Sequence, residues 1–136
     1  MRDRRKFVTA AVCAAIALTA ATGRAGAQTA VSPFTRTTLG TIAYPDDQHL
    51  CLQQLLEAPA TRPVARLTHP GVEATTVISG SFLLSVEGKP DRLVKAGESF
   101  FIAPYVPHSG RTGPDGTRMV ATFFVEKGKP LVAPAP

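Results

Sequence analysis

The sequence predicts one small all-β domain, built as an antiparallel sandwich, a jelly roll or a small barrel. Glycine and proline interrupt residues 28–136 at short intervals, and no long stretch shows the 3.6-residue apolar period of an amphipathic helix. Runs of residues that favour strands lie between these breaks. Many short strands joined by tight turns are typical of these all-β architectures.

Eight runs of four to nine residues are the candidate strands. They cover residues 35–43, 49–57, 64–69, 74–79, 82–87, 92–95, 99–103 and 118–126. Turns are predicted between them, for example at Gly80-Ser81 and at Gly113-Pro114-Asp115-Gly116, because glycine, proline and aspartate favour turn conformations. The run 49–57 contains four leucines whose spacing also suits a helical turn or two, so this alternative stays open.

Residues 1–27 have the composition of an export signal. A basic segment over 2–6 precedes an uncharged, mostly small and apolar run over 7–22, and Ala25-Gly26-Ala27 offers a cleavage site of small residues. We therefore expect a periplasmic or secreted protein that starts at Gln28. The apolar run is too short and too weakly apolar for a membrane span, so no stable membrane anchor is expected.

The paired arginines Arg4 and Arg5 resemble the twin-arginine export motif, with general secretory export as the alternative. Residues 1–27 also carry net charge +4 of the chain's +5, which leaves residues 28–136 near neutral. The mature chain therefore lacks the basic cluster that nucleic-acid binding requires. Cys51 is its single cysteine, so an intrachain disulfide is excluded there.

Two short motifs carry the most specific information about function. In the first, three residues separate His69 from Glu73, and six more separate Glu73 from Gly80. The second runs from Gly97-Glu98 through several apolar and proline residues to His108. The pair resembles the two motifs of the cupin family, in which the first motif normally begins His-x-His.

The sequence departs from the cupin pattern at several positions. Leu67 stands where the first histidine of the first motif is expected. In the second motif, Ala103 replaces a proline, Tyr105 replaces a glycine and Thr112 replaces a frequent asparagine. The resemblance still covers residues 34–134, nearly the whole mature chain.

The resemblance implies a cupin-like double-stranded β-barrel, or jelly roll, over 28–126. The tail over 127–136 contains three prolines and little to bury, so we expect it to be extended on the surface or disordered. The resemblance also implies that His69, Glu73 and His108 are metal ligands. Residues 67 and 69 share one side of a strand, and Glu73 can face the same space from the next strand. Two imidazoles and one carboxylate suit a divalent ion, iron or manganese above all, with nickel, copper and zinc as alternatives.

Two hypotheses about function follow. The first is a metal-dependent enzyme, oxygenase-like, that acts on a small molecule. The second is a non-catalytic or metal-free module that binds a small molecule, because Leu67 removes one donor from the expected ligand set. No residue outside the ligand set is identified as a general base. A homodimer is expected, because cupin-like barrels often pair through their sheets.

Several other residues have two interpretations. His49 can replace the missing ligand, but an exposed histidine beside a turn is the favoured interpretation. Arg66, Arg111 and Arg118 can contact an anionic ligand, although solvated arginines are the usual finding on a barrel surface. Cys51 lies between two leucines, which favours a small apolar role over a reactive thiol.

Overall fold

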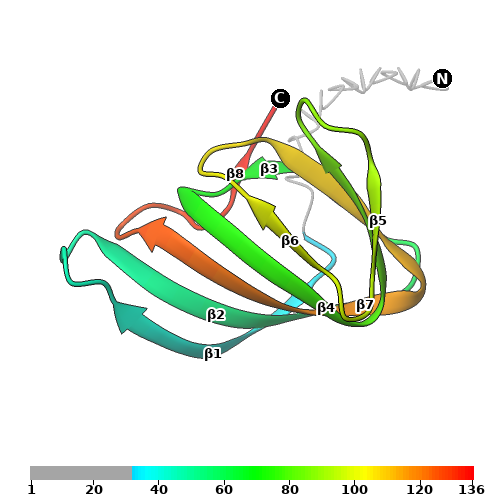
Figure 1. Cartoon of the computed structure of the whole chain (residues 1–136), viewed down its shortest axis with the longest axis horizontal. Helices are drawn as coiled ribbons and strands as arrows, with labels where there is room; N and C mark the ends of the chain where they lie inside the picture. Colours follow the sequence, from blue (N-terminus) through cyan, green and yellow to red (C-terminus); the bar gives the residue numbers. More distant parts are fainter. Residues whose placement is uncertain (1–31) are drawn as a thin grey trace, which may run out of the picture.

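All regular elements of the computed structural model, which describes residues 32–136, are β-strands (Figure 1). They are β1 (Thr35–Ala43), β2 (His49–Ala58), β3 (Pro63–Thr68), β4 (Gly71–Val86), β5 (Arg92–Lys95), β6 (Ser99–Ile102), β7 (His108–Glu126) and β8 (Ala133–Pro134). This part of the chain has no helix long and apolar enough to cross a membrane. The predicted export signal, residues 1–27, lies outside the described residues.

Two strands, β4 and β7, are long enough to take part in both layers of the barrel (Figure 1). In one layer the order is β1-β2-β7-β4-β6, and all neighbouring strands are antiparallel. In the other layer the order is β8-β3-β7-β4-β5, again antiparallel. The predicted all-β jelly roll is confirmed.

The prediction of turns at Gly80-Ser81 and at Gly113–Gly116 was wrong. The chain does not reverse there. It bends, and β4 and β7 continue side by side, with Gly80 paired to Thr117. Both Gly80 and Gly116 have positive φ angles, 72° and 80°, and a Cβ atom on Gly80 would lie 2.0 Å from the Gly116 carbonyl oxygen. Glycine is therefore needed for a sharp bend in two paired strands.

The run with four leucines, 49–57, is a strand and not a helical segment. Its Leu56 is buried and joins the core between the two layers. Alternation is clearest along β7, where Met119, Ala121, Phe123 and Val125 are almost completely buried and the residues between them are more exposed. This buried face of β7 forms one side of the space that contains the candidate site.

The C-terminal segment 127–136 contains the two-residue strand β8, at the edge of the second layer. β8 pairs with β3, with Ala133 opposite Thr68 and Pro134 opposite Leu67. The amide of Ala135 donates a hydrogen bond to the carbonyl of Arg66 at 3.1 Å. Residues far apart in sequence are thereby held beside the strand that leads to His69.

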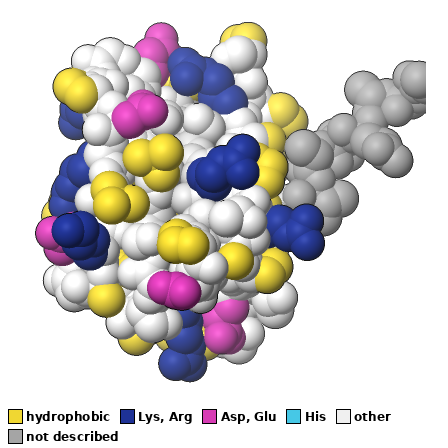
Figure 2. Space-filling view, turned by 90° about the vertical axis from the view of Figure 1, so that its right-hand side faces the viewer, with side chains coloured by type: hydrophobic (Ala, Val, Ile, Leu, Met, Phe, Trp, Pro, Cys, Tyr) yellow, Lys and Arg dark blue, Asp and Glu magenta, His cyan; other side chains and the backbone are white. Residues whose placement is uncertain are grey.

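The outer surface mixes charged and apolar side chains. On the face shown in Figure 2, Lys and Arg side chains lie among acidic and apolar ones, without a continuous basic area. Across the first layer, in contrast, Ile42, Cys51, Phe124 and Val72 occupy paired positions on four neighbouring strands. Ile42 is 70% exposed, so this apolar row is open to contact.

Candidate metal centre

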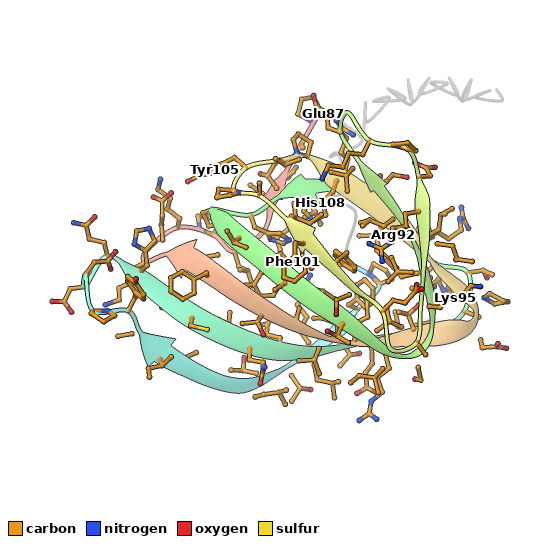
Figure 3. All side chains as sticks on the ribbon, viewed as in Figure 1. Glu87, Arg92, Lys95, Phe101, Tyr105 and His108 are labelled. Atoms are coloured by element: carbon orange, nitrogen blue, oxygen red, sulfur yellow. The ribbon has the colours of Figure 1, made fainter. Side chains whose placement is uncertain are left out.

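The structure brings the side chains of His69, Glu73 and His108 together inside the barrel. His69 follows β3, Glu73 lies near the start of β4, and His108 is the first residue of β7. All three are buried, and their potential ligand atoms lie within 4.8 Å of one another. Figure 3 shows His108 inside the barrel, near the turn that carries Tyr105.

Local sequence explains how these residues reach one space. Pro70 and Gly71 turn the chain directly after His69, so that Glu73 enters the adjacent strand facing inward. The amide of Tyr105, in the turn before β7, donates to the carbonyl of His69 at 3.0 Å. This hydrogen bond connects the backbone of the first motif to the turn that precedes His108.

Each histidine ring uses its Nδ1 atom to contact a backbone carbonyl. Nδ1 of His69 lies 2.7 Å from the carbonyl oxygen of Leu131, and Nδ1 of His108 lies 3.0 Å from that of Val106. A carbonyl oxygen only accepts hydrogen bonds, so Nδ1 carries the proton and donates it. In the neutral rings, Nε2 therefore presents a lone pair to the interior.

Both Nε2 lone pairs face the carboxylate of Glu73. Oε1 of Glu73 accepts a hydrogen bond from the hydroxyl of Thr75 at 2.6 Å. Oε2 is buried and has no hydrogen-bond partner, although Nε2 of His69 lies at 3.0 Å and Nε2 of His108 at 3.3 Å. Three acceptor atoms so close together in a buried space repel one another unless a proton or a cation lies between them.

These distances fit a divalent ion. Bonds from such an ion to imidazole nitrogen or carboxylate oxygen measure about 2.0–2.2 Å, so that donors at right angles lie about 3 Å apart. The two distances from Oε2 of Glu73, 3.0 and 3.3 Å, are of this size. The carbonyl partners of the two Nδ1 atoms fix the rings as outer partners do in metal sites. The donor set can therefore hold a metal ion.

The charge state of Glu73 is consistent with this interpretation. Burial acts to raise the pKa of Glu73, but the rings of His108 and His69, which donate from Nε2 when a proton and not a metal ion lies between the donors, and the hydroxyl of Thr75 outweigh it and lower the pKa from 4.5 to about 2. Glu73 is thus an ionised carboxylate over the physiological pH range. A metal ion that binds here takes the place of a proton shared with the histidines.

A small cavity of about 30 Å³ adjoins the three residues. This volume holds roughly one water molecule. Leu67 lines the cavity and is 6% exposed, so the residue at the first-histidine position of the motif does face the site. Phe123 lies on another side, with its ring 4.8 Å from that of His69.

The charged residue Arg36 lines the cavity and was missed by the sequence analysis. Arg36 of β1 reaches the cavity from the edge of the first layer. It lies in the polar run Thr35-Arg36-Thr37-Thr38, where no apolar alternation marks an inward position. The pairing of β1 with β2 determines its direction, because Arg36 lies opposite the buried Leu56.

The other residues considered from sequence lie outside the site. His49 is a partly exposed residue whose Nδ1 contacts Asp46 at 2.5 Å, so it does not replace the missing ligand. Arg66 pairs with Glu87 at 2.9 Å, and Arg118 pairs with Glu57 at 3.4 Å, on the surface. Arg111 is exposed and donates to a backbone carbonyl. Cys51 is a free, partly buried cysteine.

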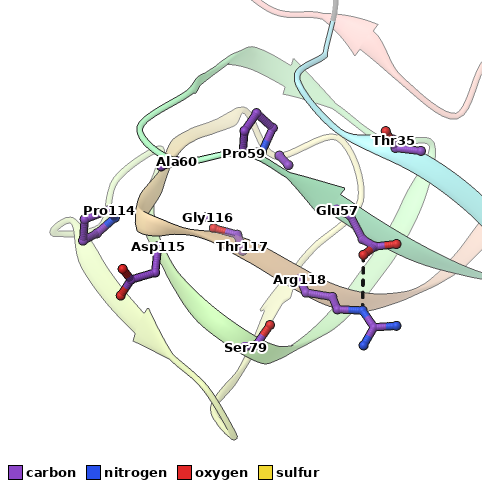
Figure 4. A pocket seen from close by; sticks show the side chains of 11 residues that line it. Thr35, Glu57, Pro59, Ala60, Ser79, Pro114, Asp115, Gly116, Thr117 and Arg118 are labelled. Atoms are coloured by element: carbon purple, nitrogen blue, oxygen red, sulfur yellow. Dashed lines mark ion pairs between the residues drawn. The ribbon is translucent and has the colours of Figure 1, made fainter.

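A larger hollow of about 580 Å³ lies elsewhere, where the end of β2 meets the bend in β7 (Figure 4). Its lining includes Glu57, Asp115 and Arg118 but no histidine, and it shares no residue with the cavity beside Glu73. Its charged side chains are exposed to solvent. We therefore place the candidate site at the small, buried cavity.

Residues 56–126, slightly more than half of the chain, match the sequence profile of the family described as "Cupin domain". The chain belongs to the cupin family. No curated protein matches the sequence of this cupin significantly.

Solved structures share the fold of this cupin. An RmlC-like cupin from Shewanella frigidimarina is 22% identical, with a TM-score of 0.58 over 71% of this chain and 80% of that chain. A DMSP lyase from Ruegeria pomeroyi is 19% identical, with a TM-score of 0.57 over 78% of this chain and 62% of that chain. An oxalate oxidase in complex with glycolate is 18% identical, with a TM-score of 0.58 over 82% and 59%. This cupin spans less than two thirds of the last two chains.

Proposed function

We propose that this chain is an exported, metal-dependent cupin enzyme that acts on a small molecule, with His69, Glu73 and His108 as ligands of a divalent ion. The observation that carries the proposal is the buried Oε2 atom of Glu73, which faces two imidazole nitrogens and has no hydrogen bond. Iron or manganese is favoured, because two histidines and one carboxylate with open positions form the ligand set of non-haem iron oxygenases. Nickel, copper and zinc suit the same donors.

The residues around the ligands supply orientation and exclude water. The carbonyls of Leu131 and Val106 hold the rings in one tautomer, and Thr75 holds one carboxylate oxygen. When bound, a divalent ion supplies Lewis acidity and open coordination positions. Two structurally similar cupins are enzymes by name, a DMSP lyase and an oxalate oxidase, which supports an enzymatic role for this chain.

Metal analysis of the protein, purified under mild conditions after export, tests the proposal. We expect about one equivalent of iron or manganese in the wild type and a large loss in His108→Ala, because His108 supplies one of three donors. His49→Ala is the matched control, since His49 is a partly exposed histidine that pairs with Asp46 and lies outside the site. Retention of full metal content by His108→Ala would contradict the proposed ligand set.

The second candidate function is a metal-free module that binds a small molecule. One observation favours it: Leu67 directs an apolar side chain into the cavity where a fourth donor is expected. Wild-type protein that holds no metal, and takes up none from Fe²⁺ or Mn²⁺ solutions, would support this alternative over the enzyme.

Export and self-association are part of the same proposal. If the chain is exported, we expect the mature protein to begin at Gln28. The mass of the protein recovered from the periplasm or the medium tests this expectation. Replacement of Arg4 and Arg5 by lysine would abolish twin-arginine export and leave general secretion intact.

The exposed apolar row of Ile42, Cys51, Phe124 and Val72, beside the edge strand β1, supports a homodimer with a second copy. Sedimentation of the wild type and Phe124→Glu tests this contact. A dimer in the wild type and a monomer in the variant are expected.

A further inference from the structure

Arg36 is the one arginine that lines the cavity beside Glu73, within the part of the chain that the structure describes. It lies on β1 opposite the buried Leu56, and its partly buried side chain reaches the cavity. His69, Glu73 and His108 line the same cavity. A guanidinium and a metal-ligand set therefore adjoin one small space.

The guanidinium of Arg36 makes one side-chain hydrogen bond and no ion pair within residues 32–136. Its Nη1 donates a hydrogen bond to Oε1 of Gln54 at 3.1 Å. Among residues 32–136 no carboxylate lies within ion-pair distance of it, so that a neutral amide is its main partner. Burial lowers the pKa of Arg36, and the charge of Glu73 acts in the opposite direction. A partly buried guanidinium with five donors and one neutral acceptor favours an anion that supplies more acceptors.

Two other arginines of the barrel, Arg66 and Arg118, differ from Arg36 in their partners. Arg66 and Arg118 each have a carboxylate partner, Glu87 and Glu57 respectively, although Nε of Arg66 is buried without a hydrogen bond. Arg36 is turned inward without such a partner. A divalent ion would add two positive charges to a space where the charges of Glu73 and Arg36 already cancel, so an anion would lower the net positive charge of the loaded site.

We propose that Arg36 binds the carboxylate of a small anionic ligand or substrate in the cavity beside His69, Glu73 and His108. The inference rests on the proposed function, which it deepens by naming small carboxylates as the ligand class. Planar carboxylates match the fork of donors on a guanidinium. The cavity is small, about 30 Å³, so formate and acetate, the smallest carboxylates, are the suitable probes.

Calorimetric titration of metal-loaded protein with formate and acetate tests the inference. The wild type is expected to bind both acids and to bind formamide and acetamide at least about tenfold more weakly, because the amides lack the charge. Arg36→Met should weaken formate binding by at least about tenfold, and Arg36→Lys by less, because lysine keeps the charge and loses the fork. Arg118→Met, a surface control, should match the wild type.

Metal content measured on the same samples separates the two proposals. Arg36→Met that keeps its metal and loses formate binding supports the inference. Arg36→Met that keeps both overturns it and leaves the metal site standing. Loss of metal in Arg36→Met also overturns it, since Arg36 would then act only to support Glu73.

A wild type that takes up no metal contradicts the proposed enzyme, and the titration is then repeated on the metal-free protein. Formate binding that depends on Arg36 would still support the carboxylate site. Absence of formate binding, or binding that Arg36→Met leaves unchanged, would overturn it.

Discussion

His69 and His108 have the same chemical role in the candidate site but are oriented by different parts of the chain. Nδ1 of His108 donates to the carbonyl of Val106, two residues earlier. Nδ1 of His69 donates to the carbonyl of Leu131, which is 62 residues later in the sequence. One ring is therefore positioned by its own turn, and the other by the C-terminal segment.

The C-terminal segment is therefore part of the structure that orients His69. Leu131 is held on one side by the pairing of β8 with β3. On the other side, Lys129 contacts Glu126 at 2.6 Å and the hydroxyl of Tyr105 at 3.0 Å. The hydrogen bond to Glu126 raises the pKa of Lys129, and the same bond lowers the pKa of Glu126. These contacts connect the segment to the turn before β7.

Removal of either ring should cause the largest effect. Loss of an outer partner of a ligand typically lowers metal affinity by about 10–100-fold, so loss of the ligand itself in His69→Ala or His108→Ala should exceed about 100-fold. The two losses should be similar, because each ring supplies one donor to the same ion. Competition with a chelator of known Mn²⁺ affinity measures both. A loss confined to one variant would mean that the two rings do not share an ion.

The stability of the protein in acid tests the contribution of Glu73, whose carboxylate faces both histidine rings. The pKa of Glu73 is lowered from 4.5 to about 2, so its stabilising contribution is complete above about pH 4.5 and is lost as the pH falls towards 2. A shift of this size corresponds to about 3 kcal/mol of unfolding free energy. Urea unfolding of metal-free protein between pH 2 and 6 measures it.

Glu73→Gln is the reference for that measurement. Glutamine cannot ionise, so the difference in unfolding free energy between wild type and variant should change by about 3 kcal/mol over this interval. Other carboxylates, such as Asp46 and Glu126, titrate in both proteins and cancel. A difference that does not vary with pH would mean that Glu73 has no favourable contact with the rings.

The same contrast between local and long-range contacts explains what the sequence could predict. Strands such as β1 and β5 were predicted with the observed bounds, because turn residues flank them closely. The spacing of His69 and Glu73 around one turn is a local pattern, and so is the turn before His108. The convergence of His108 with His69 and Glu73 was expected from the resemblance of the two motifs to those of cupins, since the motifs lie far apart in the sequence.

Other structural features could not be predicted, because no local sequence pattern indicates them. The sequence predicts turns at Gly80 and Gly116, because a glycine that bends two paired strands cannot be told from one that reverses the chain by local sequence alone. Arg36 lies in a polar run, and only the pairing of β1 with β2 turns it inward. The contact of Leu131 with His69 uses a backbone carbonyl, which every residue type supplies. No side-chain pattern marks it.

Deletion of residues 131–136 tests whether His69 depends on the C-terminal segment. We expect metal affinity to fall by about 10–100-fold, because the ring loses the acceptor that fixes its tautomer and orientation. Deletion of residues 133–136 is the matched control: it removes β8 but keeps the Leu131 carbonyl. Leu131→Ala is a second control, since it keeps the carbonyl and removes only the side chain.

Chelator competition and urea unfolding of each shortened protein separate positioning from stability. Equal loss of metal affinity in both deletions would assign the effect to β8 pairing and not to the Leu131 carbonyl. Unchanged affinity in both would show that His69 is oriented without the segment.

Leu67→His should produce a smaller effect of opposite sign. Leu67 lies opposite His108 in the pairing of β3 with β7, and it lines the cavity, so a histidine there adds a third imidazole to the site. We expect Mn²⁺ affinity to rise by about tenfold, with Leu67→Met as a control of similar volume whose thioether is a poor ligand for this ion. The same substitution should partly restore affinity in the protein that lacks residues 131–136, because the added ring does not need the Leu131 carbonyl. Unchanged Mn²⁺ affinity in the full-length protein and in the shortened protein would mean that residue 67 does not reach the ion. The ligand set would then be restricted to His69, Glu73 and His108.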